Sequence, residues 1–562
     1  MKVEENKLNR RKFLTFIGTG TVALAAIATG VDKITENSIS NKLSDFFGLE
    51  MDSSIDFFKE ISPSLEDELI LPEGYTYNVI AAYGDVINQS GDTFGFDCDY
   101  TVYFPIDGSN ERGLLWVNHE SSSEIFVHGI KKNGRYTHEQ IYKILYNQGG
   151  SLIEIYLDND GIWKMDTHSK FARRVTGFTP MDLTGPAKGS PAVKGALCVQ
   201  GTFTNCAGGK TLWNTVLSCE ENFEETAPLV GLEPTHYGWV IEVDPFDDTF
   251  QVKKHTALGR FHHENAVMGL TRDSKVVVYS GDDLIGGCIY KYISTETYQE
   301  NLGRKNSRLL EDGKLYAADL QNGEWLELTI ENVRNALNKE TFNVPKQIQA
   351  TKDQLLNAYQ TQADVLVYAH YAALIIGATP TDRPEDIEIS PFDNSIFIAH
   401  TNNPETGNTH GHITRIFEKG EDLGASKFEY EIFLAGGKES GLSSPDNLLI
   451  DSKGNLWIVT DISGSKINQG EHKSFGNNGM FIVPTTGSKK GQAHQFASAP
   501  IEAELTGPWF TPNEKTLFLA VQHPGEETKE INNPTSMWPH REGDLIPRPA
   551  VVAIQGFKKL NK

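Results

Sequence analysis

The sequence predicts an all-β protein, built as a six-bladed β-propeller with helical insertions. Three observations support this fold class: a turn-rich composition, a short motif that occurs six times, and regular spacing of its copies. Glycine contributes 51 of the 562 residues and the hydrophobic content is a modest 39%. That balance suits a turn-rich β protein better than a helical one.

Each copy of the motif consists of a polar turn, a short apolar strand and a loop rich in Asp, Glu, Asn or His. The copies are GLLWVNHESS from Gly113, NTVLSCEENF from Asn214, KVVVYSGDDL from Lys275, SIFIAHTNNP from Ser395, NLWIVTDISG from Asn455 and TLFLAVQHPG from Thr516. Three of the five intervals are roughly 60 residues long, a spacing typical of blades around an axis. A multi-domain β-sandwich protein is the alternative, but it does not explain why the same strand exit is polar six times.

Two stretches interrupt the repeat, at about 130–195 and about 303–376. The second contains IENVRNALNKETF, KDQLLNAYQ and ADVLVYAHYAALIIGAT, whose apolar spacing predicts helices with Gly377 as a C-cap. We expect these helices to pack on the outside of the propeller or to cover its mouth. The prediction is therefore one propeller domain over 46–562, preceded by a leader and linker over 1–45.

The N-terminus resembles a targeting segment. In NRRKFLTFIGTGTVALAAIATG, Arg10 and Arg11 precede Phe13 and Leu14, and a weakly apolar run follows. This order predicts a twin-arginine export signal, and with it the twin-arginine translocase as an early partner and a periplasmic, cell-surface or extracellular location. The run is shorter than the ~20 residues of a spanning helix, so we expect no stable membrane insertion after cleavage; an uncleaved anchor is the alternative.

The net charge of −24 makes nucleic acid and anionic membranes poor partners. Excess carboxylate either keeps the protein soluble or binds hard cations. The five cysteines are an odd number without CxxC spacing, so no disulfide framework is indicated, although one bridge stays open.

If the six copies are equivalent strands, their polar loops meet at one end of the propeller axis. Loops at matching positions add NCAGG with Cys206, RFHHEN with Glu264, and SSPDN with Asp446. Crowded carboxylates raise one another's pKa unless cations intervene. Oxygen ligands favour calcium, and a thiolate among them favours a transition metal such as iron. For Cys206, a buried inert thiol and a disulfide remain alternatives.

DRPEDIE adds Arg383 beside Glu385 and Asp386. A guanidinium in an acidic site either forms an ion pair with such neighbours or holds an anion such as phosphate bidentately. The sequence leaves both readings open.

Together these stretches resemble the PhoX-type alkaline phosphatases. The motifs, in chain order, are NCAGGKTLW with LSCEE, GRFHHENA, YSGDD, RPEDIEISP, GHITRIFE, SSPDNLLIDSKGNLWIVTD, TLFLAVQHPGE and RPAVV. The resemblance runs from about residue 72 to about residue 551. It implies a secreted or periplasmic phosphomonoesterase with a buried cluster of Fe³⁺ and Ca²⁺ at the axis of a six-bladed propeller. We also expect the protein to be a monomer.

The resemblance also implies roles for individual residues. Cys206 is expected to bind iron, Glu264 and Glu385 to bridge metals, and Asp446 to be a further ligand. Arg383 is expected to hold the phosphoryl oxygens, so the catalytic set is Arg383, Cys206, Glu264 and Glu385. Further ligand candidates are Asn118, Glu120 and Glu220, with Asn118 also a candidate for substrate binding.

By the same resemblance, a metal-activated oxygen attacks phosphorus in line with the leaving group, and no serine nucleophile is required. Two features depart from the family pattern: FGFDCDY has Asp97 and Cys98 in an expected asparagine-rich loop, and TLWNT lacks a proline. The alternatives are a calcium-dependent propeller lactonase or phytase, and a non-catalytic binding propeller stabilised by calcium.

Overall fold

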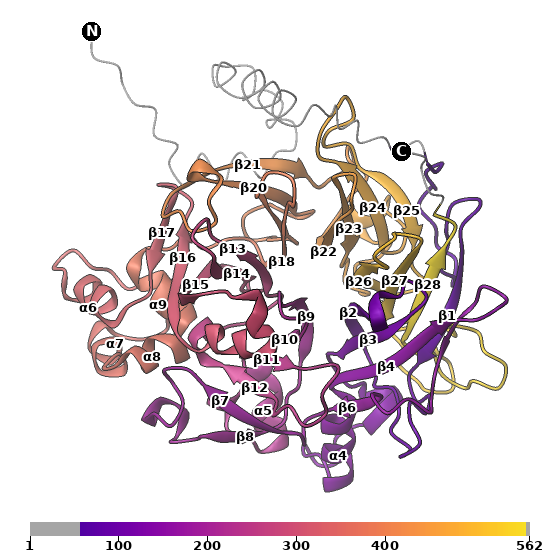
Figure 1. Ribbon diagram of the computed structural model, residues 1–562, viewed down its shortest axis with the longest axis horizontal. Coiled ribbons are helices and arrows are strands. Elements are labelled where there is room, and N and C mark those ends of the chain that lie inside the picture. Colours follow the sequence, from indigo (N-terminus) through magenta and orange to yellow (C-terminus); the bar gives the residue numbers. More distant parts are fainter. Residues whose placement is uncertain (1–54, 56, 558–562) are drawn as a thin grey trace.

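The fold is mostly β-sheet with few helices, as predicted. The computed structural model describes residue 55 and residues 57–557, and in this part of the chain the strands form six sheets arranged around a common centre (Figure 1). The predicted twin-arginine leader lies outside the described residues. Among the described helices, none combines the length and apolar character that crossing a membrane requires.

The first three sheets follow one another along the chain. The first contains β2 (Cys98–Pro105), β3 (Arg112–His119), β4 (Gly149–Leu157), β5 (Trp163–Met165) and β6 (Arg173–Val175). The second contains β7 (Pro180–Thr184), β8 (Cys198–Gln200), β9 (Asn205–Lys210), β10 (Val216–Glu220), β11 (Val240–Val243) and β12 (Lys253–His255). The third contains β13 (Val267–Leu270), β14 (Lys275–Gly281), β15 (Ile289–Thr297), β16 (Gly313–Asp319) and β17 (Glu324–Glu327).

The remaining three sheets complete the circuit. The fourth contains β18 (Pro384–Ile389), β19 (Ile396–His400), β20 (His412–Glu418) and β21 (Phe428–Ala435). The fifth contains β22 (Pro445–Ile450), β23 (Asn455–Thr460), β24 (Gly479–Pro484) and β25 (His494–Ser498). The sixth contains β26 (Glu504–Phe510), β27 (Thr516–Gln522), β28 (Ala550–Gln555) and β1 (Thr76–Ala82), so the first described strand pairs with the last.

One strand of each sheet faces the centre. These inner strands are β2, β9, β13, β18, β22 and β26, and each contacts the inner strands of the sheets before and after it, which closes a ring. The six motif copies found in the sequence form β3, β10, β14, β19, β23 and β27, each of them the strand beside an inner strand. The copies are therefore equivalent in position.

Apolar side chains fill the space between neighbouring sheets. Trp116 of β3 and Ile241 of β11 belong to one buried cluster, and Trp457 of β23 and Leu519 of β27 belong to another. Burial of these large side chains holds the sheets against one another.

The two predicted insertions differ. Strands β4 to β7 belong to the first two sheets, so most of 130–195 is part of the ring rather than an addition to it, with helix α4 (His138–Asn147) beside it. In 303–376, the chain first completes η6 (Glu300–Leu310), β16 and β17 are sheet strands, and the α-helical part is confined to 330–376. It forms α6 (Ile330–Asn338), α7 (Lys352–Ala358), α8 (Gln362–Val367) and α9 (Ala369–Ile376), packed on the outer side of the ring (Figure 1). Gly377 caps α9, as predicted.

Apart from η6, which spans 11 residues, the other helical segments are short. They are η1 (Ile106–Gly108), η2 (Glu124–His128), η3 (Pro191–Val193), α5 (Phe223–Val230), η4 (Pro234–His236), η5 (Thr256–Leu258), η6 (Glu300–Leu310), η7 (Lys419–Glu421) and η8 (Gly470–His472).

Candidate metal centre

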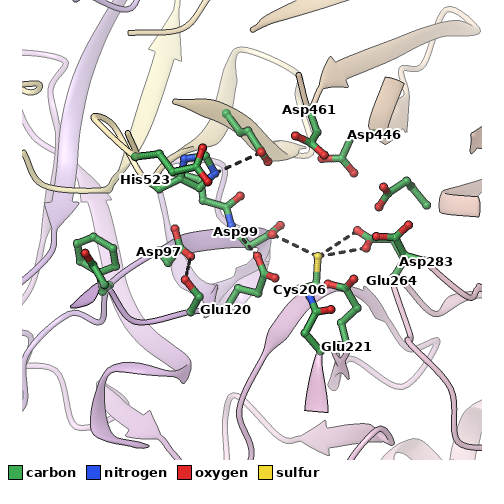
Figure 2. Close-up of a pocket in the computed structure, with 18 of the residues that line it drawn as sticks. Asp97, Asp99, Glu120, Cys206, Glu221, Glu264, Asp283, Asp446, Asp461 and His523 are labelled. Carbon is green, nitrogen blue, oxygen red and sulfur yellow. Dashed lines mark hydrogen bonds and ion pairs between the residues drawn. The ribbon is translucent and has the colours of Figure 1, made fainter. Parts of the chain in front are cut away.

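The beginnings of the inner strands surround a cavity of about 620 Å³. Its wall is dominated by acidic side chains and one thiol: Asp97, Asp99, Glu120, Cys206, Glu221, Glu264, Asp283, Glu385, Asp446, Asp461, Glu504 and Glu526. Figure 2 shows the sulfur of Cys206 with carboxylates directed toward it from several sheets. Within the described part of the chain, Arg383 and His523 are the basic side chains of this wall.

One acidic or thiol residue comes from the start of each inner strand. They are Asp99 of β2, Cys206 of β9, Glu264 just before β13, Glu385 of β18, Asp446 of β22 and Glu504 of β26. The pairing of β2, β18 and β22 with the next strand shifts register at this point, as in a β-bulge. Because a bulge redirects the side chains beside it, these strands turn their first residues toward the cavity.

A second set of wall residues comes from the exits of the neighbouring strands. Glu120 follows β3, Glu221 follows β10, Asp283 lies just after β14, Asp461 follows β23 and His523 follows β27. These exits are the polar loops of the repeated motif. The sequence prediction that they converge at one central site is therefore confirmed by the positions of these residues.

Three groups of wall residues bring their ligand atoms within 4.8 Å of one another: Asp99 with Glu120 and Cys206, Cys206 with Glu221 and Glu264, and Glu264 with Glu385 and Asp446. The Cys206 sulfur lies 3.1 Å from Glu264 Oε2 and 3.4 Å from Asp99 Oδ2. Cys206 and Glu264 each belong to two groups, so the three groups form one continuous cluster.

The cluster lies largely out of contact with solvent and consists of acidic side chains and one thiol. Burial raises the pKa of Glu264 well above its usual range, and the charges of Glu385 and Asp446 raise it further. Burial likewise raises the pKa of the Cys206 thiol, with Asp99 and Glu264 adding to the effect. Asp99 Oδ1 is buried without a hydrogen-bond partner. Such a donor set fits bound cations, which favour the ionised form of each ligand.

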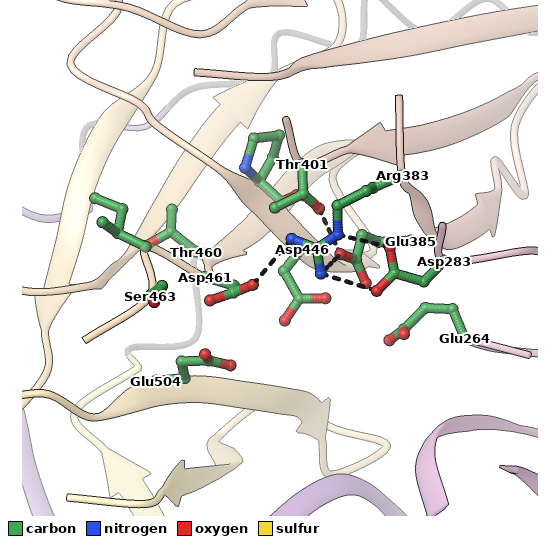
Figure 3. A network of polar contacts seen from close by, with 12 residues as sticks. Glu264, Asp283, Arg383, Glu385, Thr401, Asp446, Thr460, Asp461, Ser463 and Glu504 are labelled. Carbon is green, nitrogen blue, oxygen red and sulfur yellow. Dashed lines mark hydrogen bonds and ion pairs between the residues drawn. The ribbon is translucent and has the colours of Figure 1, made fainter. Parts of the chain in front are cut away.

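Arg383 reaches into the acidic wall from the residue before β18 (Figure 3). Its Nε and Nη2 atoms each lie 2.8 Å from one carboxylate oxygen of Asp283, and Nη2 also lies 2.8 Å from Glu385 Oε1. Nη1 has only a 3.5 Å contact, to Asp461 Oδ2. The ion pair with Glu385 that the sequence allowed is therefore present, while Nη1 keeps hydrogen-bonding capacity toward the cavity.

Of the predicted site residues, Arg383, Cys206, Glu264, Glu385, Asp446 and Glu120 line the cavity. Burial and the nearby Asp97 raise the pKa of Glu120 to about 7. The prediction for Glu220 is corrected: its carboxylate points away from the cavity, accepts hydrogen bonds from the backbone of Gly238 and Trp239, and pairs with Lys254 at 2.6 Å.

Asn118 also lies outside the cavity wall. Its side-chain amide donates to the carbonyl oxygens of Cys206 and Ala207 at 2.6 and 2.9 Å, and its oxygen accepts from Trp116 Nε1 and Ser218 Oγ at 2.7 and 2.8 Å. All of its hydrogen-bonding atoms are engaged inside the fold. The prediction of Asn118 as a metal or substrate ligand is corrected accordingly: it holds the backbone that carries Cys206.

The sequence reasoning missed Asp99 and Glu504 as site residues, and of the adjacent glutamates 220 and 221 in a motif exit it chose Glu220 as a ligand candidate rather than Glu221. A signal for the two missed residues was present, because each inner strand forms a hairpin with a repeated-motif strand. The residue that starts the inner strand therefore lies beside the motif exit, and this rule leads to Asp99 in FDCDY and Glu504 in EAELTG. The five cysteines are unpaired; Cys98 is buried outside the wall and Cys198 is exposed.

A family model described as alkaline phosphatase PhoX matches residues 57–525. The chain belongs to this family. Among solved structures, Pseudomonas fluorescens PhoX in complex with vanadate, a transition state analogue, is similar, with a TM-score of 0.77 and 30% identity over 89% of this chain and 97% of that chain. A Xanthomonas campestris gluconolactonase has a TM-score of only 0.29 and 10% identity, over 82% and 96% of the two chains. No curated protein matches.

Family membership and the likeness to a PhoX structure assign the reaction class. This chain is a phosphoric monoester hydrolase, and its substrates are small-molecule phosphoesters. The acidic cavity combines possible metal ligands with an arginine, which makes it the candidate site for this chemistry.

Proposed function

We propose that this phosphatase binds Fe³⁺ and Ca²⁺ in the central cavity and hydrolyses phosphomonoesters there. The observation that carries the proposal is the position of the Cys206 sulfur, buried between the carboxylates of Asp99 and Glu264. A thiol at the meeting point of carboxylates is an unsuitable core residue but a suitable ligand. Thiolate favours a transition metal, whereas an all-oxygen set favours calcium.

The three ligand groups divide between the two metals on this basis. The groups that contain Cys206 would hold iron, with Glu221 or Asp99 and Glu120 as oxygen ligands. The group of Glu264, Glu385 and Asp446 offers only oxygen and would hold calcium. Glu264 belongs to both sets, which supports its assignment as a bridging carboxylate.

When bound, these cations supply charge stabilisation for the attacking and leaving oxygens of an in-line phosphoryl transfer. Arg383 contributes from the protein. Asp283 fixes its guanidinium through two hydrogen bonds, so Nη1 can donate to a phosphoryl oxygen without a change in the side chain. A planar, charged donor fixed in this way orients the phosphoryl group and favours the charge of the transition state.

We further propose that the six sheets are the blades of a single propeller over 46–562, and that residues 1–45 direct export by the twin-arginine translocase. The closed ring of inner strands and the pairing of β1 with β28 support the first point. The paired arginines of the leader support the second. The mature enzyme would act as a monomer outside the cytoplasm.

The test combines elemental analysis of the purified protein with phosphate release from a generic phosphomonoester. Cys206→Ser should lose iron and most of the activity. Cys198→Ser is the matched control, since Cys198 is exposed on β8 and does not line the cavity; it should keep both. Equal iron content and equal activity in the two variants would show that the Cys206 thiolate is not a ligand in the site. An active wild-type protein with calcium but no iron would exclude the iron assignment.

A further inference from the structure

The cavity has an apolar side in addition to the carboxylates of the three ligand groups, which we call the acidic floor. Six apolar residues line it: Phe96, Ile125, Phe126, Leu284, Ile285 and Pro524. We call this set the apolar wall. Each of its members lies within a few residues of an acidic or basic wall residue in the same loop: Phe96 precedes Asp97, and Leu284 follows Asp283. The same loops therefore supply both surfaces.

The two surfaces lie at different depths. Apart from Glu120, the carboxylates of the ligand groups are buried, and Glu264 is 0% exposed. Of the apolar wall, Phe96 and Pro524 are buried, Ile125, Phe126 and Leu284 are half-buried, and Ile285 is 46% exposed. Exposure thus increases from the acidic floor to the part of the apolar wall formed by Ile125, Phe126, Leu284 and Ile285, which places that part toward the cavity mouth. A phosphoryl group held at the floor would direct the rest of the ester along this wall.

The wall is held in a defined conformation. Ile125 and Phe126 lie on η2, a single π-helical turn in which His128 N–H bonds to Ser123 O at 3.1 Å. The Ser123 hydroxyl accepts hydrogen bonds from the backbone N–H groups of Ile125 and Phe126. On the opposite loop, Gly286 N–H bonds to Thr381 O at 2.8 Å, next to Ile285. Preorganised apolar surface binds without an added ordering cost.

The cavity is also larger than phosphate requires. A volume of about 620 Å³ lies within the range of roughly 300–1,000 Å³ that accommodates a drug-sized ligand. Ser121 donates to Asp97 and Gln522 donates to Glu120, whereas Gln522 Oε1 has no hydrogen-bond partner and the Asn222 side chain does not cap α5. The lining therefore has six apolar side chains and four neutral polar ones, of which Ser121 and the Gln522 amide already donate to carboxylates.

We propose that the apolar wall binds the alcohol portion of the substrate, so that the preferred substrates are monoesters of aryl or longer alkyl alcohols rather than sugar phosphates. The inference rests on the proposed function, because the floor must hold the phosphoryl group. Apolar contact with the leaving group raises kcat/KM in proportion to the apolar surface that it buries.

The test uses the metal-loaded full-length protein and three esters: ethyl phosphate, hexyl phosphate and glucose 6-phosphate. Ethyl and hexyl phosphate differ in apolar length but hardly in leaving-group acidity, and hexyl phosphate and glucose 6-phosphate have the same number of carbons. We expect the wild-type kcat/KM to be highest for hexyl phosphate. A wild-type preference for glucose 6-phosphate over hexyl phosphate would overturn the inference.

The variants are Ile285→Ser and Phe126→Ala, with Ile162→Ser as a control at a site of similar exposure, 43%, outside the cavity wall. Each wall variant should lower the ratio of kcat/KM for hexyl over ethyl phosphate by about three- to tenfold, and the control should not change it. If both wall variants released phosphate with an unchanged hexyl-to-ethyl ratio of kcat/KM, the apolar wall would not bind the alcohol portion of the substrate. Failure of the wild type to release phosphate from any ester would instead refute the proposed function.

Discussion

Replacement of Asn118 by alanine should destabilise the protein even when no metal is bound. The side chain makes four buried hydrogen bonds: two donated to the carbonyls of Cys206 and Ala207, and two accepted from Trp116 and Ser218. Each buried group left without a partner costs about 1–3 kcal/mol. A water molecule in the vacated space recovers part of this, so we expect a loss of about 3–5 kcal/mol.

The assay is urea unfolding of the chelator-treated protein, followed by tryptophan fluorescence. Asn343→Ala is the control, because Asn343 is exposed and its amide makes only a 3.4 Å contact with Thr341 O; its effect should stay within about 0.5 kcal/mol. If Asn118→Ala unfolded within about 1 kcal/mol of the wild type but lost metal, Asn118 would be a ligand and the positioning role would be wrong.

Three further predictions concern the cavity. Arg383→Ala should lower kcat/KM about a hundredfold and weaken inhibition by inorganic phosphate; an unchanged inhibition constant would assign the anion to another residue. Ser121→Ala should retain activity, because the proposed chemistry needs no serine nucleophile; an inactive but metal-loaded variant would contradict this. Burial and mutual repulsion raise the pKa of Glu264, Glu385 and Asp446. Raised carboxyl pKa values stabilise the metal-free fold below about pH 4, and this contribution is lost as the pH rises through them. Chelated protein should therefore melt at a lower temperature at about pH 9 than at about pH 6, and the difference should shrink when metal is restored.

Much of the fold could be predicted because the same local pattern occurs in every sheet. Six apolar segments with polar exits correspond to six strands in equivalent positions. Equivalence of position then predicted which loops meet, and the resemblance to the PhoX-type phosphatases selected Cys206, Glu264, Glu385 and Asp446 within those loops, although they lie far apart in the chain. The stretch 130–195 was harder to interpret, because β5 and β6 have three residues each and leave little periodic signal.

The errors at the site come from side-chain direction rather than from topology. Successive residues of a strand point to opposite sides, so Glu220 and Glu221 cannot both reach the cavity. The sequence LSCEEN does not reveal at which residue β10 ends, and the pairing of Glu220 with Lys254 is visible only in three dimensions. Asn118 lies on β3, two residues before Glu120, which follows that strand. At its position the side chain reaches backbone carbonyls rather than the cavity.

The centre of the ring combines strained backbone with mutually repelling carboxylates, and bound cations can offset both costs. Asp97, Thr204, Arg383 and Ser444 each have a φ of 54° two residues before a cavity residue, and such left-handed backbone costs about 1 kcal/mol or more per residue. The buried carboxylates repel one another as well. Cations stabilise only the folded arrangement that brings these ligands together, so metal binding and folding are coupled. A protein that binds the proposed metals benefits from acquiring them while it folds, which agrees with the proposed leader for the export of folded proteins.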